Sequence, residues 1–202
     1  IDSLLYEENL SLHNINNWYW VKDRFLCINL NKNSEFLISF GSLIPCFEKE
    51  SFFTLLPNNI KIKINKDSLS TYNEVSDYKT NLLYCIKQVI KTPYLWGGKS
   101  SYGYDCSGLV QSLVKVSCNI LLPRDTSKMI KSDNLIITDT PNVGDIVFFK
   151  MNKTVDHVGI YLSDIIFIHS SGLVKLNSID RNSKYFSKEL AINYYRTYKI
   201  KL

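Results

Sequence analysis

Over the first third of the chain, short hydrophobic runs alternate with polar breaks. Four runs are rich in β-branched and aromatic residues and are separated by Asn, Gly and Pro; they cover residues 18–21, 24–30, 35–40 and 60–64. β-branched and aromatic side chains favour strands, whereas Gly, Asn and Pro favour turns. Short strands at this spacing predict a small all-β, barrel-like region over residues 1–70.

Beyond a boundary near residues 67–76, the hydrophobic period changes to that of a helix. Apolar residues recur on one face of residues 78–91. Thr92-Pro93 ends this run, because the residue before a proline is disfavoured in helical geometry. A second stripe of apolar residues follows Cys106. The two stripes predict two helices.

The last part of the chain predicts strands. After a turn at 141–145, apolar runs occupy residues 146–150, 157–162 and 165–169, and further candidates are residues 175–179 and 193–200. Helices followed by strands indicate an α+β domain, with helices packed on an antiparallel sheet, and not alternating βαβ units. We expect this domain over residues 76–202.

Composition and charge narrow the class of protein. The 202 residues are 45% hydrophobic and 13% aromatic, which is typical of a packed globular chain. The net charge of +5 is spread along the sequence, so it does not predict nucleic-acid binding. No apolar run approaches the roughly 20 residues that span a bilayer, and we expect no transmembrane segment.

Five cysteines bear on metal binding and on the compartment. Their spacing fits no zinc pattern, and their odd number argues against a disulfide framework. We expect no metal and no cofactor, and we interpret all cysteines except Cys106 as free and mostly buried. Free thiols favour a cytoplasmic location. A periplasmic or secreted location stays open, because the chain starts without Met and can be a trimmed product.

Cys106 stands directly after a glycine-rich segment and at the start of the second predicted helix. Unpaired N–H groups and the positive dipole end of a helix N-terminus favour the thiolate, the nucleophilic form of cysteine. His157 is the leading candidate for its base, because an imidazole takes up a thiol proton near neutral pH. The alternative interpretation is a structural cysteine and a core histidine.

His169 is a candidate for orienting this base. If residues 157–162 and 165–169 form a hairpin with an odd-numbered loop, three residues (162–164) or five, His157 lies directly opposite His169. A two-residue loop would put the two imidazoles on opposite faces of the sheet. We predict the odd loop.

Attack on a carbonyl also requires donors for the developing oxyanion. The backbone N–H of Cys106 is one candidate, since it lies at the predicted helix start. Tyr94 can supply a phenolic donor, and aromatic packing beside Trp96 is an alternative of equal weight.

Six motifs resemble the NlpC family, papain-like cysteine peptidases that cut bacterial cell-wall peptides. They occur in the family's order and cover nearly all of residues 78–180. The motifs are Y-x-W-G-G at 94–98, D-C-S-G-L-V at 105–110, P-R-D-T at 123–126, G-D-I-V-F-F at 144–149, D-H-V-G-I-Y at 156–161 and F-I-H-S-S-G at 167–172.

The resemblance implies a murein peptide as substrate. The bond cut would join γ-D-glutamyl to a diamino acid, typically meso-diaminopimelate, by thiolate attack and an acyl-enzyme. The resemblance assigns Cys106 as nucleophile, His157 as base and His169 as the orienting third member of a triad. It also implies that the Tyr94 side chain points at the oxyanion site.

Residues 99–111 and the β-rich N-terminal region resemble the dipeptidyl-peptidase VI type subgroup. Its members trim free muropeptides with an N-terminal L-Ala, and a bacterial Src-homology-three-like barrel narrows their cleft. Residues 1–70 would then hold one such barrel, or two with the first one worn or truncated.

The same resemblance implies that acidic side chains bind the free amine of the substrate. Asp125 and Asp105 match the motif positions, and Asp156 is another candidate. Ser107 is a candidate for binding the substrate backbone. Asp125 can also cap a following helix, and the two roles are compatible.

Two other functions stay open. The β-rich region can contact the cell wall while the peptidase domain cuts intact murein, as a wall-bound hydrolase or binding module. The third possibility is a related amidase or acyltransferase on the same fold.

Overall fold

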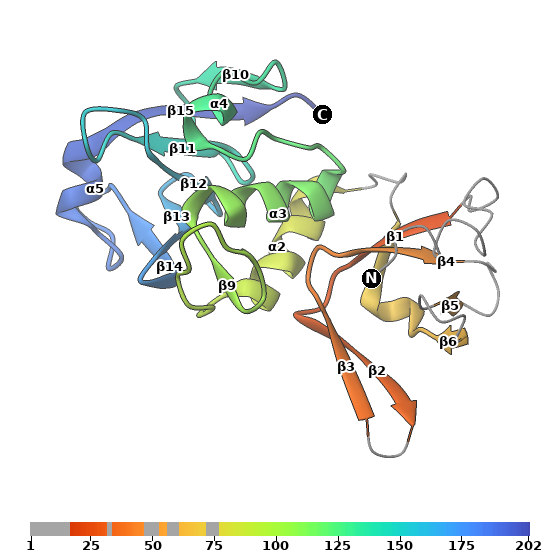
Figure 1. Cartoon of the computed structure of the whole chain (residues 1–202). Coiled ribbons are helices and arrows are strands. Elements are labelled where there is room, and N and C mark those ends of the chain that lie inside the picture. The colour runs from red at the N-terminus through yellow and green to blue at the C-terminus, as the bar shows by residue number, and fades with distance from the viewer. Residues whose placement is uncertain (1–16, 32–33, 47–52, 56–60, 72–76) are drawn as a thin grey trace. The chain divides into compact units, whose positions relative to one another are not determined.

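The structure is a computed structural model, and it describes residues 17–31, 34–46, 53–55, 61–71 and 77–202 (Figure 1). The chain divides into two compact units, Ile1–Glu74 and Val75–Leu202. None of the helices in the described ranges has both the length and the apolar character that crossing a bilayer requires.

The N-terminal unit consists of short strands and one 3-10 turn, η2 (Lys66–Ser68), in its described part. The strands form a sheet of order β4-β1-β7 and two ribbons, β2-β3 and β5-β6. Their bounds are β1 Asn17–Val21, β2 Phe25–Asn31, β3 Ser34–Ser39, β4 Leu43–Cys46, β5 Phe53–Leu55, β6 Lys61–Lys63 and β7 Leu69–Thr71. Buried residues from the sheet and from both β2 and β6 share one cluster: Tyr19, Val21, Leu26, Ile28, Ile44, Cys46, Ile62, Ile64 and Leu69. The expected all-β character of this region is confirmed.

Three strands of this unit were not expected from the hydrophobic pattern. β5 and β7 are three residues long, which is too short for a period-2 signal. β4 contains Pro45, which is tolerated because β4 lies at the edge of its sheet.

The C-terminal unit packs two helices, α2 (Tyr78–Val89) and α3 (Cys106–Cys118), beside a six-stranded antiparallel sheet (Figure 1). The sheet order is β10-β15-β11-β12-β13-β14. The sheet strands are β10 Leu135–Thr138, β11 Ile146–Phe149, β12 His157–Tyr161, β13 Ile166–Ser171, β14 Leu173–Ser178 and β15 Tyr194–Ile200. Short elements complete the unit: β8 Lys99–Ser100, β9 Gly103–Tyr104, α4 Thr126–Met129 and α5 Lys188–Asn193. The predicted α+β class is confirmed, and β10 is an additional strand.

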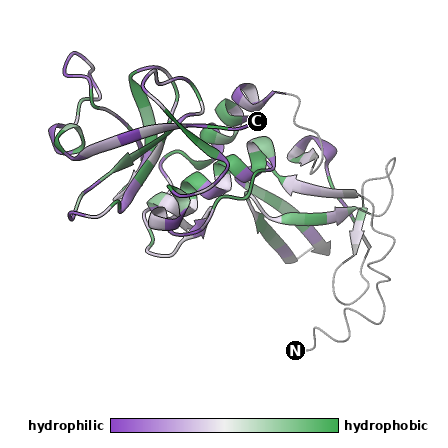
Figure 2. Cartoon of the chain, turned by 90° about the horizontal axis from the view of Figure 1, so that it is seen from above, coloured by the Kyte–Doolittle hydropathy of each residue, from purple (hydrophilic) through white to green (hydrophobic). Residues whose placement is uncertain are grey.

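Both faces of the central strands are covered, which explains their continuous apolar runs. All four residues of β11 are buried. On one face, Val147, Phe149 and Phe167 pack with Leu190 of α5. Alternate residues such as Phe148 and Ile168 are also fully buried. Figure 2 shows stretches of hydrophobic colouring on several strands and helices, and hydrophilic colouring on parts of the loops.

The β12–β13 hairpin has the predicted parity but a different register. Leu162 N–H donates to the Ile166 carbonyl, which leaves a three-residue loop at 163–165. Gly159, and not His157, is therefore the residue directly opposite His169. The prediction of direct opposition is wrong by two residues, because the loop lies one position further along the chain than expected. The two histidines still share a face, as diagonal neighbours.

Candidate active site

The cysteine at the start of α3 is presented by a capped helix end. The Asp105 carboxylate accepts a hydrogen bond from the Gly108 N–H at 2.6 Å and so caps the helix. Cys106 is the first helical residue, and its side chain is nearly buried. Its thiol lies 3.8 Å from the Asp156 carbonyl oxygen, directly before β12. The helix N-terminus thus aims the sulfur at the start of the histidine-bearing strand.

The protonation of this thiol differs from the sequence expectation. Burial raises the pKa of Cys106 above its ordinary value, and the negative charge of Asp105 raises it further. Hydrogen bonds from the backbone at Ser107 and Val158 and from the Thr126 side chain act in the opposite direction. The predicted resting thiolate is therefore corrected: the free site holds a neutral thiol, because desolvation outweighs the helix end.

His157 and His169 form a direct hydrogen bond. His157 Nε2 lies 2.7 Å from His169 Nδ1, and the two rings are nearly perpendicular, at 87°. Gly159 makes this contact possible, because a side chain there would stand on the same face, opposite His169. A Cβ on Gly159 would lie 2.7 Å from the Ile168 carbonyl oxygen and 3.3 Å from His169 Cβ.

Both imidazoles are neutral at pH 7. Burial, helped by the neighbouring His169 and Lys175 and opposed by Asp156, lowers the pKa of His157 to about 3. Burial also lowers the pKa of His169 to about 4, although its hydrogen bond to Asn177 acts in the opposite direction. The resting site is thus a neutral thiol beside two neutral imidazoles.

Asn177 extends this hydrogen-bond chain and was missed from the sequence. His169 Nε2 lies 2.8 Å from Asn177 Oδ1. Lys175 is the direct partner of His169 across the β13–β14 pair, and Asn177 is two residues further along the same face. The register of this hairpin would have revealed the pairing, but the sequence marked residues 175–179 only as a candidate strand.

Asp105 is held by Arg124, which the sequence reasoning also passed over. Arg124 donates to both carboxylate oxygens of Asp105, at 3.0 and 2.5 Å, and to Ser107 Oγ at 2.7 Å. The Gly97 N–H also donates to Asp105 Oδ2, at 3.0 Å. The charge of Asp105 is neutralised and both of its oxygens have partners, so Asp105 supports the helix start and the Gly97 turn.

The other two predicted acidic residues differ in their surroundings. Asp156 accepts hydrogen bonds from the Met151 and Asn152 N–H groups and from the Asn152 side chain, which fixes the loop before β12. Asp125 stands at the N-cap position of α4 without a side-chain capping bond, so the expected cap is not formed. Its carboxylate is 60% exposed and lies 3.4 Å from Lys128 Nζ.

Two adjoining cavities meet at Cys106. One has a volume of about 630 Å³ and contains Asp125 and Arg124 in its lining. The other has a volume of about 470 Å³, and its lining contains the imidazole pair. Four residues line both cavities: Tyr94, Trp96, Cys106 and Asp156. A peptide can therefore extend from the sulfur in two directions.

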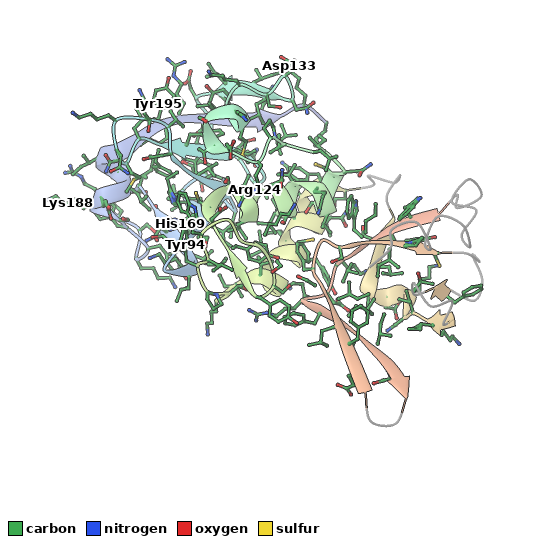
Figure 3. All side chains as sticks on the ribbon, viewed as in Figure 1. Tyr94, Arg124, Asp133, His169, Lys188 and Tyr195 are labelled. Carbon is green, nitrogen blue, oxygen red and sulfur yellow. The ribbon has the colours of Figure 1, made fainter. Side chains whose placement is uncertain are left out.

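The surroundings of Tyr94 fit a neutral phenol beside the sulfur. Figure 3 shows Tyr94 near His169, and both line the smaller cavity. Burial raises the pKa of Tyr94, the charge of Asp105 acts in the same direction, and the charge of Arg124 opposes both. Its backbone N–H donates to the Gly172 carbonyl at 2.9 Å, which anchors the segment. Its role as an oxyanion donor stays a prediction.

The other four cysteines line neither cavity. Cys46, Cys85 and Cys118 are free and buried, as expected, whereas Cys27 is free but exposed. Within the described ranges, no group of three or more His, Cys, Asp or Glu side chains is placed to hold a metal ion.

Comparison with known proteins finds relatives of this chain. The NlpC/P60 family model matches residues 91–194. A γ-D-glutamyl-L-lysine dipeptidyl-peptidase of Bacillus cereus is 29% identical over 69% of this chain and 44% of that protein. Dipeptidyl-peptidase 6 of Lysinibacillus sphaericus is 31% identical over 56% of this chain and 41% of that protein. The chain thus spans less than half the length of these two relatives.

A solved structure shows the same fold. The crystal structure of an NlpC/P60 family protein from Bacillus cereus ATCC 10987 matches with a TM-score of 0.74, at 23% sequence identity. The match covers 92% of this chain and 64% of that chain. It therefore extends into the N-terminal β region and is not confined to the helices and the six-stranded sheet.

Proposed function

This chain belongs to the NlpC/P60 family, and on that basis we propose that it is a cysteine peptidase that hydrolyses the γ-D-glutamyl–diamino acid bond of murein peptides. One observation carries the proposal: Cys106 at a helix N-terminus shares a cavity with the hydrogen-bonded pair His157 and His169. A thiol, a base and a group that orients the base are the parts that cysteine-based acyl transfer requires.

The proposed reaction starts from the neutral thiol. His157 takes the thiol proton as the sulfur of Cys106 attacks the γ-carbonyl carbon of D-glutamate, so that an S–C bond forms and negative charge develops on the carbonyl oxygen. The backbone N–H of Cys106 and the hydroxyl of Tyr94 are the proposed donors to that oxygen. Protonated His157 then gives its proton to the leaving amine, the C–N bond breaks, and water hydrolyses the remaining thioester.

The larger cavity is the proposed place for the acyl side of the substrate. A free N-terminal L-Ala carries an ammonium group, and a carboxylate in a partly enclosed site can form a charge-assisted hydrogen bond with it. Of the three predicted acidic residues, Asp125 has the most exposed carboxylate, whereas Asp105 forms an ion pair with Arg124. We therefore assign the amine to Asp125 and a supporting role to Asp105.

The smaller cavity is the proposed place for the leaving diamino acid. Lys175 and Glu189 both line it, so it offers one positive and one negative side chain. L-Lysine and meso-diaminopimelate both carry ammonium and carboxylate groups that can pair with these. The name of the Bacillus cereus relative specifies L-lysine, so we propose a diamino acid as the leaving group.

Mass analysis of the products from defined tripeptides tests this function. We expect L-Ala-γ-D-Glu-L-Lys or its meso-diaminopimelate counterpart to yield L-Ala-γ-D-Glu and the free diamino acid. The N-acetylated tripeptides are the matched substrates, and they should be cut much more slowly. Cleavage of another bond, or equal cleavage with the amine blocked, would contradict the assignment.

A further inference from the structure

We propose that Asn177 is a positioning residue that sets the direction of the hydrogen-bond chain through both imidazoles, so that His157 presents an unprotonated ring nitrogen to the Cys106 thiol. The inference rests on the proposed function, because it concerns the residues that would activate the nucleophile. Neither the family comparison nor the sequence motifs point to Asn177.

The first step is the orientation of the Asn177 side-chain amide. Its Nδ2 donates to the Tyr185 carbonyl oxygen at 3.0 Å. That carbonyl also accepts from the Ser178 backbone N–H at 2.9 Å, so its position is fixed by the chain beside it. A carbonyl oxygen accepts and never donates, so the amide nitrogen must lie on this side. The Asn177 carbonyl oxygen is consequently turned toward His169.

The second step is the proton position on His169. Asn177 Oδ1 also only accepts, so the proton of the 2.8 Å bond must reside on His169 Nε2. In a neutral imidazole the other nitrogen then carries a lone pair, which makes His169 Nδ1 an acceptor. The low pKa of His169, about 4, keeps this ring neutral at pH 7.

His169 in turn fixes the proton position on His157. Because His169 Nδ1 accepts, the proton of the 2.7 Å bond must reside on His157 Nε2. His157 Nδ1 is then the unprotonated nitrogen, and it is the one left for the thiol. The thiol proton can move to Nδ1 while Nε2–H continues to donate to His169, so the resulting imidazolium keeps its partner.

The reversed arrangement would block the reaction. If His169 carried its proton on Nδ1, His157 Nε2 would have to accept, and the proton of neutral His157 would lie on Nδ1. That nitrogen could not take a proton from sulfur. Asn177 excludes this arrangement, because its oxygen would then face an unprotonated His169 Nε2.

The effect of a charge at position 177 on the imidazole pKa values depends on the other polar groups around the two rings. They are Asp156 before β12, Lys175 on β14, Glu189 on α5 and the Cys106 thiol on α3. Lys175 lowers the pKa of both imidazoles, and Asp156 raises that of His157. A carboxylate at 177 would accept from His169 as the amide does and would favour a protonated ring, but it would lose the donor to the Tyr185 carbonyl.

Imidazole ¹⁵N NMR tests the proton positions without any substrate. The chain has three histidines, so few signals need assignment. At pH 7 we expect the proton of both His157 and His169 on Nε2, with Nδ1 unprotonated. A proton on Nδ1 of either ring in the intact chain would overturn the proposal.

Variants of Asn177 provide the functional arm of the test. Asn177→Leu removes the acceptor, and we expect kcat to fall on the order of ten- to a hundred-fold with KM changed less than about twofold. The His169 signal should shift to a mixture of tautomers. Asn177→Asp keeps the acceptor, so it should retain more activity than Asn177→Leu. The acid limb of its pH profile of kcat should move to higher pH. Asn134→Ala changes an exposed amide that lines neither cavity, and it serves as the control.

The outcomes separate this inference from the proposed function. A Leu variant with unchanged tautomers and full activity would refute the role of Asn177, even if wild-type protein cleaves the tripeptide. If the wild type cleaves no γ-D-glutamyl bond but the tautomers shift as expected, the proposed function fails and the proton arrangement stands. Circular dichroism of each variant, matched to the wild type, establishes that the comparison is made on folded protein.

Discussion

At the scale of single residues, the carboxylate available to bind substrate is the one without a strong hydrogen-bond or ion-pair partner in the fold. Arg124 satisfies both oxygens of Asp105, and Asp156 is committed to the backbone of its loop. Asp125 is left with one exposed lysine as its described partner. Sequence motifs single out Asp125 and Asp105, with Asp156 as a further candidate, but a motif does not show which carboxylate has a partner in the fold.

Asp125→Asn tests the assignment of the free amine. It removes the charge but keeps the shape, so we expect KM for free-amine tripeptides to rise roughly three- to tenfold, while KM for acetylated ones changes little. Asp133→Asn is the matched control, since Asp133 is a surface carboxylate outside both cavities (Figure 3). Equal effects on free and acetylated substrates would refute the assignment. Steady-state kinetics on both substrates supply the measurement.

At the scale of elements, the odd length of the β12–β13 loop could be predicted from the sequence, but the pairing register of the two strands could not. Side chains alternate along a strand, so an odd loop was enough to put His157 and His169 on one face. The loop position depends on backbone hydrogen bonds such as that from Leu162 to Ile166, and it shifted the pairing by two residues. The raised pKa of Cys106 could likewise not be predicted from the local sequence, because burial of its thiol arises from tertiary packing.

Gly159→Ala tests the close pairing of β12 and β13. The new methyl would lie 2.7 Å from a backbone oxygen of β13, so the strands must separate locally. We expect a loss of about 1–3 kcal/mol in the free energy of unfolding, as for other overpacked sites. We also expect a larger fractional loss of kcat, because the imidazoles are displaced. Thermal unfolding and kinetics of one preparation check both, and an unchanged kcat would contradict the proposed pairing.

At the scale of the whole molecule, α3 and the central strands of the six-stranded sheet, which are buried on both faces, hold the hydrogen-bond chain His157–His169–Asn177 in an apolar setting. The sequence predicted the α+β architecture and the all-β region, because hydrophobic periods report burial directly. Hydrogen-bond partners such as Asn177 and Arg124 escaped it, since polar residues in loops and edge strands carry no periodic signal. A cytoplasmic location and wall contact by the N-terminal unit stay predictions.

Burial of two neutral imidazoles predicts an acid-sensitive fold. Their pKa values of about 3 and about 4 lie below the unfolded value of 6.5, so the unfolded chain binds more protons between these limits. Stability is therefore present above pH 6.5 and is lost as pH falls toward 4. We expect each imidazole to remove up to about 2 kcal/mol of unfolding free energy between pH 7 and 5. Urea unfolding at both pH values measures this loss.

A variant that lacks both imidazoles, His157→Gln with His169→Gln, provides the comparison for the acid prediction. Most of the difference between pH 7 and 5 should disappear in it. An equally large difference in that variant would show that other groups cause the acid sensitivity.

The central claim is that Cys106 is the nucleophile, and a rapid-quench experiment with mass-spectrometric peptide mapping tests it most directly. In a single turnover of L-Ala-γ-D-Glu-L-Lys, we expect a transient L-Ala-γ-D-Glu thioester on the peptide that contains Cys106, and no cleavage by folded Cys106→Ala protein. Acylation of a different residue, or hydrolysis by the Cys106→Ala variant at the wild-type rate, would contradict the account.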